Sequence, residues 1–353
     1  MTPPSGTSRQ YVHRDSLNGE NKLTKDNRIS QGVLHDVVSA LTSGEKANSE
    51  AVQILNTNRN IARTLFHVRL ELDSREREIF VKVFDDPRKT LEKRIALAEV
   101  ENRFHQDAER RFSTVRCLGV PPLLGPFLGQ PVVVVEKVKG ILLSDLLGHA
   151  VWKSAFNADD SKVGSALERV GEWLRVFHDE QNSVLRPVTP EAVLETVLRE
   201  FDRLPAPPYD ARLRSKVEKF CSRSLEQTTV RELPVVPQHG DFLPHNIIVD
   251  GDKVFGLDFN ATRLDAGVED LSNFVAYLEL FRKLPICSRR AVERWQASFL
   301  GGYGQSGWDR PLLRVFVLRK MFALLHESIR YKTLARGLIS RYVARKLANL
   351  EGE

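Results

Sequence analysis

Hydrophobic positions repeat with two different periods along this chain. In residues 65–72 they alternate with polar positions, which is the period of a half-buried strand, and the apolar run 79–84 predicts its hairpin partner. A further β-rich run follows at 131–138. Residues 89–111 and most of the chain after residue 142 instead carry apolar residues at helical spacing. The pattern predicts a small sheet with one helix, followed by a larger helical part.

A tight hairpin is predicted near residue 250. The apolar runs 247–249 and 254–257 flank Asp250-Gly251-Asp252, and an Asp-Gly pair between apolar runs is a strong hairpin signal. Antiparallel pairing of the two runs brings Asn246, just before the first strand, and Asp258, just after the second, to the same open end. Amide and carboxylate oxygens placed side by side could share one hard cation.

Three motifs surround this hairpin: His239-Gly240-Asp241 followed by Asn246, then Leu257-Asp258-Phe259, then Asp270-Leu271. Together they resemble the catalytic segment of the aminoglycoside/choline phosphotransferase family, a branch of the protein-kinase-like fold. The resemblance implies that Asp241 positions and deprotonates an acceptor hydroxyl, and that Asn246 and Asp258 hold Mg²⁺ on the phosphates of ATP. Each residue alone could be a turn or cap residue. Their occurrence in this order on one predicted hairpin favours the catalytic interpretation.

Lys82 lies on the second predicted strand, on the same side as Phe80 and Phe84. A lysine stem that covers a small apolar surface would explain this position, whereas the resemblance implies that Lys82 holds the nucleotide phosphates. In the next helix, Glu99 falls on the apolar stripe predicted to face inward, which suits the carboxylate that pairs with this lysine. Glu101 lies about 200° away around the helix. The two glutamates cannot both pair with Lys82, and we choose Glu99.

The stretch expected to hold the nucleotide phosphates departs from the kinase pattern. Kinases place a glycine-rich turn before the lysine strand, but residues 56–60 contain no glycine. Asparagine tolerates positive φ better than most residues, and Arg59 could supply charge. A G-x-G-x-x-G run does occur at 302–307, but it follows a predicted helix and not a strand, so a helix end is the better interpretation.

The resemblance assigns two further positions. Backbone groups of Glu136 to Val138 would hydrogen-bond the adenine ring, and Gly140 would follow as the link between lobes. His178 ends a helix that resembles one of the family. A buried histidine that is satisfied by a hydrogen bond is a more frequent role there than catalysis.

The resemblance implies an α+β, bilobal, protein-kinase-like fold. We expect a flexible arm at 1–30, a nucleotide-binding lobe with a small β-sheet and one helix at 31–137, and a mostly helical lobe with the catalytic hairpin and acceptor site at 138–353. The three cysteines are widely spaced and suggest neither a disulfide framework nor a zinc cluster. No signal peptide and no membrane-length apolar run are visible. We therefore expect a cytoplasmic protein.

The expected function is ATP-dependent, Mg²⁺-assisted phosphoryl transfer to a hydroxyl group of a small molecule. From Asp270 onward the chain has 15 Lys and Arg but 7 Asp and Glu. A pocket for a polycationic aminoglycoside needs carboxylates, so a neutral or anionic acceptor is expected, unless the arginines are solvated helix faces. The arginines concerned are Arg319, Arg330, Arg336, Arg341 and Arg345.

Three alternatives remain at this stage. A nucleotide-binding pseudokinase scaffold is suggested by the missing glycines, although a scaffold has no need of the intact Asp241, Asn246 and Asp258. An aminoglycoside kinase is the second alternative. A nucleic-acid-binding protein would suit the formal net charge of +6, but no stacking or groove-reading motif accompanies the charge, and we expect no nucleic-acid partner.

Overall fold

The structure is a computed structural model, and the chain divides into two compact units. Unit 1 is Met1–Ala98 with Phe127–Val134, and unit 2 is Glu99–Pro126 with Val135–Glu353. The structure describes residues 23–42, 52–72, 75–125, 127–154, 161–179, 184–205, 209–259, 264–282, 284, 287–305, 307–330, 339, 340, 343, 344 and 347.

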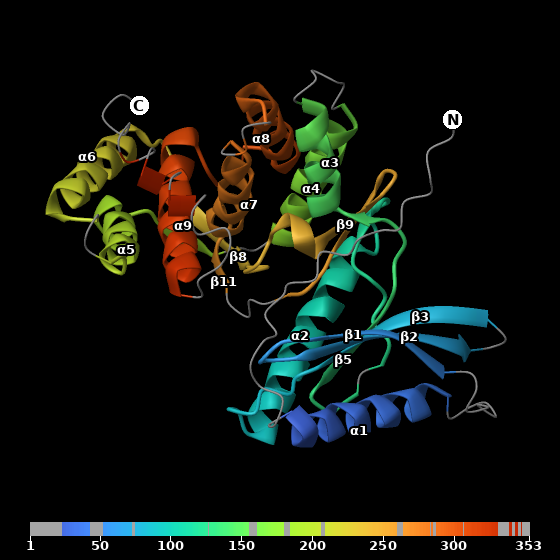
Figure 1. Cartoon of the computed structure of the whole chain (residues 1–353). Helices are drawn as coiled ribbons and strands as arrows, with labels where there is room; N and C mark the ends of the chain where they lie inside the picture. Colours follow the sequence, from blue (N-terminus) through green and yellow to red (C-terminus); the bar gives the residue numbers. More distant parts are fainter. Residues whose placement is uncertain are drawn as a thin grey trace, which may run out of the picture. The chain divides into compact units, whose positions relative to one another are not determined.

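Unit 1 is built on a four-stranded sheet of order β1-β2-β3-β5 (Figure 1). The strands are β1 (Val52–Arg59), β2 (Thr64–Leu72), β3 (Arg75–Val83) and β5 (Val132–Glu136). The first three pair antiparallel in sequence order. The predicted alternation in β2 is confirmed, because Phe66, Val68 and Leu70 are buried between more exposed neighbours. Burial of every second side chain fixes the register of a strand, since a slip of one residue would expose all three.

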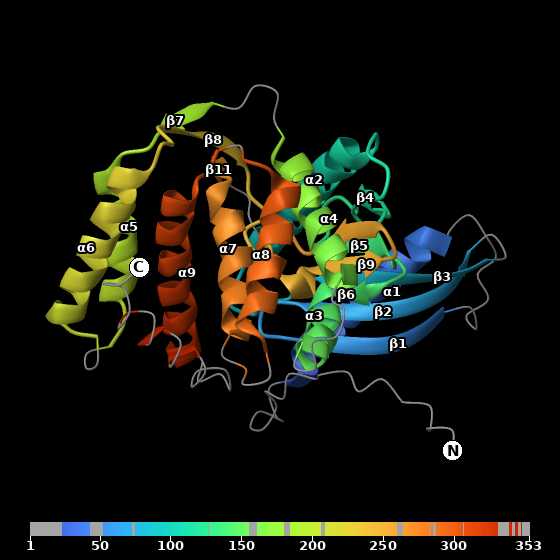
Figure 2. The ribbon, with the colours of Figure 1, turned by 90° about the horizontal axis from the view of Figure 1, so that it is seen from above.

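Helix α1 (Leu23–Thr42) lies along this sheet (Figures 1 and 2). It starts at Leu23, so residues 23–30, the end of the range 1–30 that we expected to be flexible, are helical. Residues 1–22 lie outside the described residues. The buried Ser30 hydroxyl donates to Asp85 Oδ2 at 2.6 Å, and the Thr64 hydroxyl donates to the same oxygen at 2.6 Å. This shared carboxylate ties α1 to the start of β2.

Unit 2 is mostly helical, and Figure 2 shows α6, α5, α9, α7, α8 and α4 in a row. Helix α2 (Leu91–Phe112) has its first residues in unit 1. The other helices are α3 (Leu143–Ser154), α4 (Ser161–His178), α5 (Pro190–Asp202), α6 (Ala211–Gln227), α7 (Val268–Phe281), α8 (Arg289–Tyr303) and α9 (Arg310–Arg330).

Two small sheets and a 3-10 turn complete unit 2. One sheet has the order β4-β10-β9-β6 and the other β11-β8-β7. Their bounds are β4 (Leu118–Gly119), β6 (Ile141–Leu142), β7 (Leu185–Pro187), β8 (Glu232–Pro237), β9 (Ile247–Asp250), β10 (Lys253–Gly256) and β11 (Leu264–Ala266), and the 3-10 turn is η2 (Pro244–Asn246).

The core of unit 2 is centred on Trp173, which is fully buried. Its ring stacks on Phe177 and Phe242, and its Nε1 donates to the Gly119 carbonyl at 2.7 Å. Buried aromatic rings contribute large apolar areas, and a buried indole N–H needs such an acceptor. The catalytic segment predicted from the sequence therefore starts from a rigid, well-packed base, since Phe242 directly follows Asp241.

Helices α4 and α8 approach each other closely at two glycines. A Cβ atom on Gly171 would lie 2.0 Å from the Phe299 carbonyl oxygen, and one on Gly302 would lie 1.9 Å from the Glu168 carbonyl oxygen. Only glycine permits this approach. The predicted helix end at 302–307 is confirmed, because α8 ends at Tyr303 and Gly304 caps it at φ 86°.

None of the helices in the described ranges is long and apolar enough to cross a membrane. The apolar stretch 312–325 in α9 is interrupted by Arg314, Arg319 and Lys320.

Candidate active site

The hairpin predicted around residue 250 is confirmed. β9 and β10 pair antiparallel with Lys253 opposite Asp250 and Gly256 opposite Ile247, and Gly251 in the turn has φ 63°. At the open end, the Leu257 N–H donates to the Asn246 carbonyl at 2.8 Å. The segment that ends in Asp258 is thereby held beside Asn246, twelve residues earlier in the chain.

Asn246 connects this open end to Asp241. The η2 turn is closed by the Asn246 N–H, which donates to the Leu243 carbonyl at 2.8 Å, and it returns Asn246 to the side of Asp241. The Asn246 amide Nδ2 donates to the Asp241 carbonyl at 2.9 Å and to Asp241 Oδ2 at 3.0 Å. The Asn246 side chain is buried, whereas the Asp241 side chain is 34% exposed. One amide therefore fixes the orientation of a carboxylate that remains open to a ligand.

The donor set at the open end suits a hard cation. Since the Nδ2 atom of Asn246 is engaged with Asp241, its Oδ1 is the atom left for a ligand. Asp258 has φ 58°, a conformation that non-glycine residues avoid and that often marks functional positions. Within the described ranges, no group of three or more His, Cys, Asp or Glu could hold a metal. Mg²⁺ does not require such a cage, because it keeps water and substrate phosphates among its ligands.

Asp270 supports the backbone immediately before Asp241. Its Oδ2 accepts from the His239 N–H at 2.7 Å, and its Oδ1 accepts from the Gly240 N–H at 3.0 Å. His178 Nε2 lies 3.2 Å from Asp270 Oδ2, so the expectation of a buried, hydrogen-bonded His178 is confirmed. Burial alone would raise the pKa of the Asp270 carboxyl, but the hydrogen bond from His178, the nearby His178 and His239 rings and the hydrogen bond from the His239 N–H lower it below its usual value.

His239 is fully buried among the rings of Trp173, Phe177, Phe242 and Phe259. Neither of its ring nitrogens has a hydrogen-bond partner. Burial lowers the pKa of His239, although the carboxylates of Asp270, Asp241 and Asp258 act in the opposite direction. A neutral imidazole here places an uncharged, rigid ring beneath the catalytic segment.

His245 was missed by sequence reasoning. Its Nε2 is 3.9 Å from Asp241 Oδ2, and its side chain is 49% exposed. The signal available in the sequence was its spacing of four residues after Asp241 inside a short turn, which η2 converts into proximity.

Lys82 is buried at the end of β3, with its Nζ 5.3 Å from the centroid of the Phe84 ring. The ammonium group therefore lies over an aromatic ring. In α2 the buried stripe consists of Ala98, Glu101, His105, Ala108 and Phe112. Glu99 is half-buried, and Leu91 is 49% exposed. The helical phase predicted for α2 was wrong, and Glu101 is more buried than Glu99. Which glutamate is the partner of Lys82 stays a prediction.

The glycine-free loop lies later in the chain than predicted. Most of residues 56–60 belong to β1, and the turn between β1 and β2 is formed by residues 60–63. Asn60 Oδ1 accepts from the N–H groups of Ala62 and Arg63, both at 2.9 Å, and the Asn60 N–H donates to the Arg63 carbonyl. An asparagine side chain thus closes the turn. Two backbone N–H groups that a glycine-rich loop would offer to phosphates are already used here.

At the predicted adenine contact, the Glu136 N–H donates to the Pro122 carbonyl at 2.8 Å. This N–H is not available to a nucleotide. The predicted backbone contacts would therefore come from the Glu136 carbonyl and from Val138, which follows β5.

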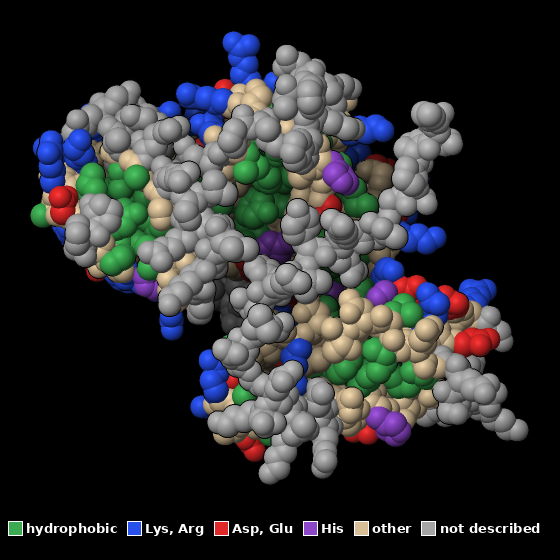
Figure 3. Space-filling view, viewed as in Figure 1, with side chains coloured by type: hydrophobic (Ala, Val, Ile, Leu, Met, Phe, Trp, Pro, Cys, Tyr) green, Lys and Arg blue, Asp and Glu red, His purple; other side chains and the backbone are tan. Residues whose placement is uncertain are grey.

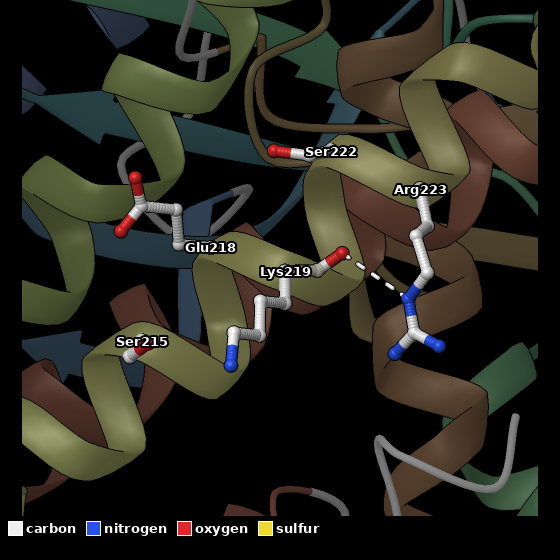
Figure 4. Close-up of a pocket in the computed structure, with 5 residues that line it drawn as sticks. All are labelled: Ser215, Glu218, Lys219, Ser222 and Arg223. Atoms are coloured by element: carbon white, nitrogen blue, oxygen red, sulfur yellow. Dashed lines mark hydrogen bonds between the residues drawn. The ribbon is translucent and has the colours of Figure 1, made fainter.

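The surface of unit 2 offers a pocket that contains none of these residues. It lies on α6 and is lined by Ser215, Glu218, Lys219, Ser222 and Arg223 (Figure 4). All five side chains come from one helix, and Arg223 Nε donates to the Lys219 carbonyl at 3.4 Å. A pocket walled by a single helix encloses little of a ligand. It carries no acid–base chemistry comparable to that of Asp241.

Known proteins share both the sequence pattern and the fold. The model of a family described as "Phosphotransferase enzyme family" matches residues 62–315. A comparison with curated protein sequences found no match. The fold is similar to that of an aminoglycoside phosphotransferase, APH(4)-Ia, with a TM-score of 0.54 and 13% identity over 89% of this chain and 98% of that chain.

Two further solved structures are similar. The choline kinase LicA from Streptococcus pneumoniae gives a TM-score of 0.50 and 11% identity over 91% of this chain and 99% of that chain. The amicoumacin kinase hAmiN, in complex with AMP-PNP, Ca²⁺ and Ami, gives a TM-score of 0.51 and 14% identity over 93% and 95%. At these identities the likeness shows the fold alone. The expected α+β, protein-kinase-like fold, with a small N-terminal sheet and a larger helical part, is confirmed.

Proposed function

Because this chain belongs to the phosphotransferase enzyme family, we propose that it acts on an alcohol group and transfers the γ-phosphoryl group of ATP to a hydroxyl of a neutral or anionic small molecule. The single observation that carries the proposal is the contact of the Asn246 amide with Asp241 at the open end of the β9–β10 hairpin. It supports the proposal because the Asn246 Nδ2 atom holds the Asp241 carboxylate, which could accept a proton, and leaves the amide Oδ1 for a metal ion.

Asp241 would orient the acceptor hydroxyl and accept its proton. The Asn246 amide holds this carboxylate directly, and Asp270 holds the backbone just before it. The position of the carboxylate is therefore set before the acceptor binds, which is what catalysis by proximity requires. Asn246 Oδ1 and the Asp258 carboxylate would hold Mg²⁺, which when bound neutralises charge on the nucleotide phosphates.

Lys82 would contribute positive charge to the same phosphates, with Glu99 or Glu101 as its carboxylate partner. Its burial beside Phe84 supports this role, because a buried ammonium group requires a compensating anion. The Glu136 carbonyl and the Val138 backbone would contact the adenine. Two backbone N–H groups of the β1–β2 turn already donate to the Asn60 side chain, so phosphate binding there would depend on side chains.

The proposal that the acceptor is neutral or anionic rests on the excess of Lys and Arg after residue 270. The structure accounts for two of these cations. Arg319 forms an ion pair with the buried Glu269 on α7, and Lys320 Nζ lies 3.8 Å from the same carboxylate. These two cations therefore balance an internal anion. Arg336, Arg341 and Arg345 lie outside the described residues. On the face shown in Figure 3, Lys and Arg side chains are dispersed over unit 2 and do not gather into one patch.

Incubation with γ-labelled ATP, with and without Mg²⁺, tests the proposal. The acceptors are a sugar, a nucleoside, a phosphorylated alcohol and the polycation kanamycin. Mg²⁺-dependent label in a neutral or acidic alcohol is the expected result. Efficient transfer to kanamycin alone would identify an aminoglycoside kinase instead. ATP binding without ADP formation under any condition would indicate a pseudokinase.

A further inference from the structure

A buried tyrosine lies behind the catalytic segment, at the end of a chain of hydrogen bonds. The Tyr303 hydroxyl on α8 lies 3.0 Å from His178 Nδ1, and His178 Nε2 lies 3.2 Å from Asp270 Oδ2. The three residues are 6%, 5% and 0% exposed. They come from three helices, α8, α4 and α7, and meet next to the His239-Gly240 backbone.

The chemistry of the three groups fixes the direction of the hydrogens. Asp270 already accepts two backbone N–H groups, and its pKa is lowered, so it is a carboxylate that can only accept. His178 must then donate from Nε2, and in the Nε2–H tautomer the Nδ1 atom is an acceptor. The Tyr303 hydroxyl donates to it. Burial, together with the nearby Asp270, raises the pKa of Tyr303, so the phenol keeps its proton.

Gly267 lies close to this hydrogen bond. A Cβ atom on Gly267 would lie 2.9 Å from the Tyr303 hydroxyl and 3.0 Å from His178 Nδ1. Gly267 precedes α7, the helix that carries Asp270 in its first turn. The backbone that enters α7 is therefore packed against the contact between Tyr303 and His178.

We propose that Tyr303 is a positioning residue that selects the Nε2–H tautomer of His178 and thereby orients the catalytic segment through Asp270. Only the expected change in kcat rests on the proposed function, because the tautomer of His178 can be observed without turnover. Loss of the hydroxyl leaves Nδ1 without a donor, so only the hydrogen bond to Asp270 still favours the Nε2–H form. Asp270 is then contacted by a less firmly oriented imidazole, and the His239-Gly240 backbone before Asp241 is held less firmly.

The test compares Tyr303→Phe with the matched variant Tyr277→Phe, in which a Tyr on α7, whose hydroxyl has no hydrogen bond to any residue that the structure describes, loses the same atom. Imidazole ¹⁵N shifts of the full chain report the tautomer of His178, and amide resonances report the His239-Gly240 backbone. In the wild type we expect the Nε2–H form. Tyr303→Phe should mix the tautomers, shift both amides and lower kcat about five- to tenfold, with the KM for ATP nearly unchanged. Tyr277→Phe should change none of these.

Two outcomes would overturn the inference. One is a His178 spectrum that is identical in Tyr303→Phe and the wild type. The other is a variant that loses thermal stability while its tautomer, its amide resonances and its kcat are retained, because that result describes a purely structural tyrosine. A wild type that transfers phosphate to no acceptor would refute the proposed function, yet the spectra would still decide whether Tyr303 controls His178.

Discussion

Substitution of Gly302 by alanine should separate α4 from α8 and loosen the support of the catalytic segment. The new Cβ would lie 1.9 Å from the Glu168 carbonyl oxygen, whereas ordinary contacts begin near 3.4 Å, so the helices must move apart by the difference. The obstacle is backbone, which cannot rotate away. Tyr303 follows Gly302 directly, and its 3.0 Å hydrogen bond to His178 would not survive such a shift.

The magnitude follows from two costs. Overpacking of a tight helix contact costs about 1–3 kcal/mol, and one lost buried hydrogen bond costs about 0.5–1.5 kcal/mol. We therefore expect the free energy of unfolding to fall by roughly 2–4 kcal/mol. Urea unfolding followed by tryptophan fluorescence measures it, because Trp173 and Trp295 are buried in unit 2.

Gly301 provides a matched control one residue earlier in the same helix. A Cβ atom there meets nothing within 4 Å, so Gly301→Ala should raise the free energy of unfolding by about 0.5–1 kcal/mol through helix propensity alone. Equal stabilities for the two alanine variants would refute the reasoning, since they would mean that the contact between α4 and α8 is not as tight as the structure has it.

Three further predictions concern the candidate site. Because burial lowers the pKa of His239, the unfolded chain takes up a proton first. Stability is therefore complete above about pH 6.5 and decreases as the pH falls toward the lower pKa of the folded state, by up to about 1.4 kcal/mol per pH unit. The free energy of unfolding of His239→Leu, measured by urea unfolding from pH 8 to pH 5, should lack this pH-dependent loss. An equal slope of the free energy of unfolding against pH in both proteins would contradict the prediction. Asp258→Ala should abolish Mg²⁺-dependent ATP binding in calorimetry. Asp252→Ala, at the exposed turn where Asp252 contacts Cys117, should leave it unchanged, and equal losses would show that the metal site is misplaced. Glu101→Gln should lower kcat/KM for ATP more than Glu99→Gln because Glu101 lies on the buried stripe of α2. The reverse order would support the choice made from the sequence.

The elements that were predicted correctly are those whose structure is determined by residues close together in the sequence. The Asp-Gly turn between apolar runs specified the β9–β10 hairpin and brought Asn246 toward Asp258, because an antiparallel register follows from the turn alone. The alternation in β2 specified its buried face for the same reason. These patterns depend on neighbours within a few residues.

The errors and omissions depend on long-range packing. Tyr303 lies 125 residues from His178, and His178 lies 92 residues from Asp270, so no local pattern indicates that they meet. The phase of α2 was wrong because its buried face includes the polar residues Glu101 and His105, which a hydrophobic pattern counts as exposed. The β1–β2 turn was misplaced because the Asn60 side chain closes it, so no glycine marks its position in the sequence.

The most direct test of the central claim is the turnover of Asp241→Asn. The amide keeps the shape of the side chain and an oxygen that can accept from Asn246 Nδ2, but it cannot accept the acceptor's proton. With an acceptor found in the labelled-ATP screen, we expect kcat to fall by about 10²-fold or more while the Kd for ATP with Mg²⁺ is retained. Turnover near that of the wild type would contradict the assignment of Asp241 as the catalytic base, and with it the account of this site.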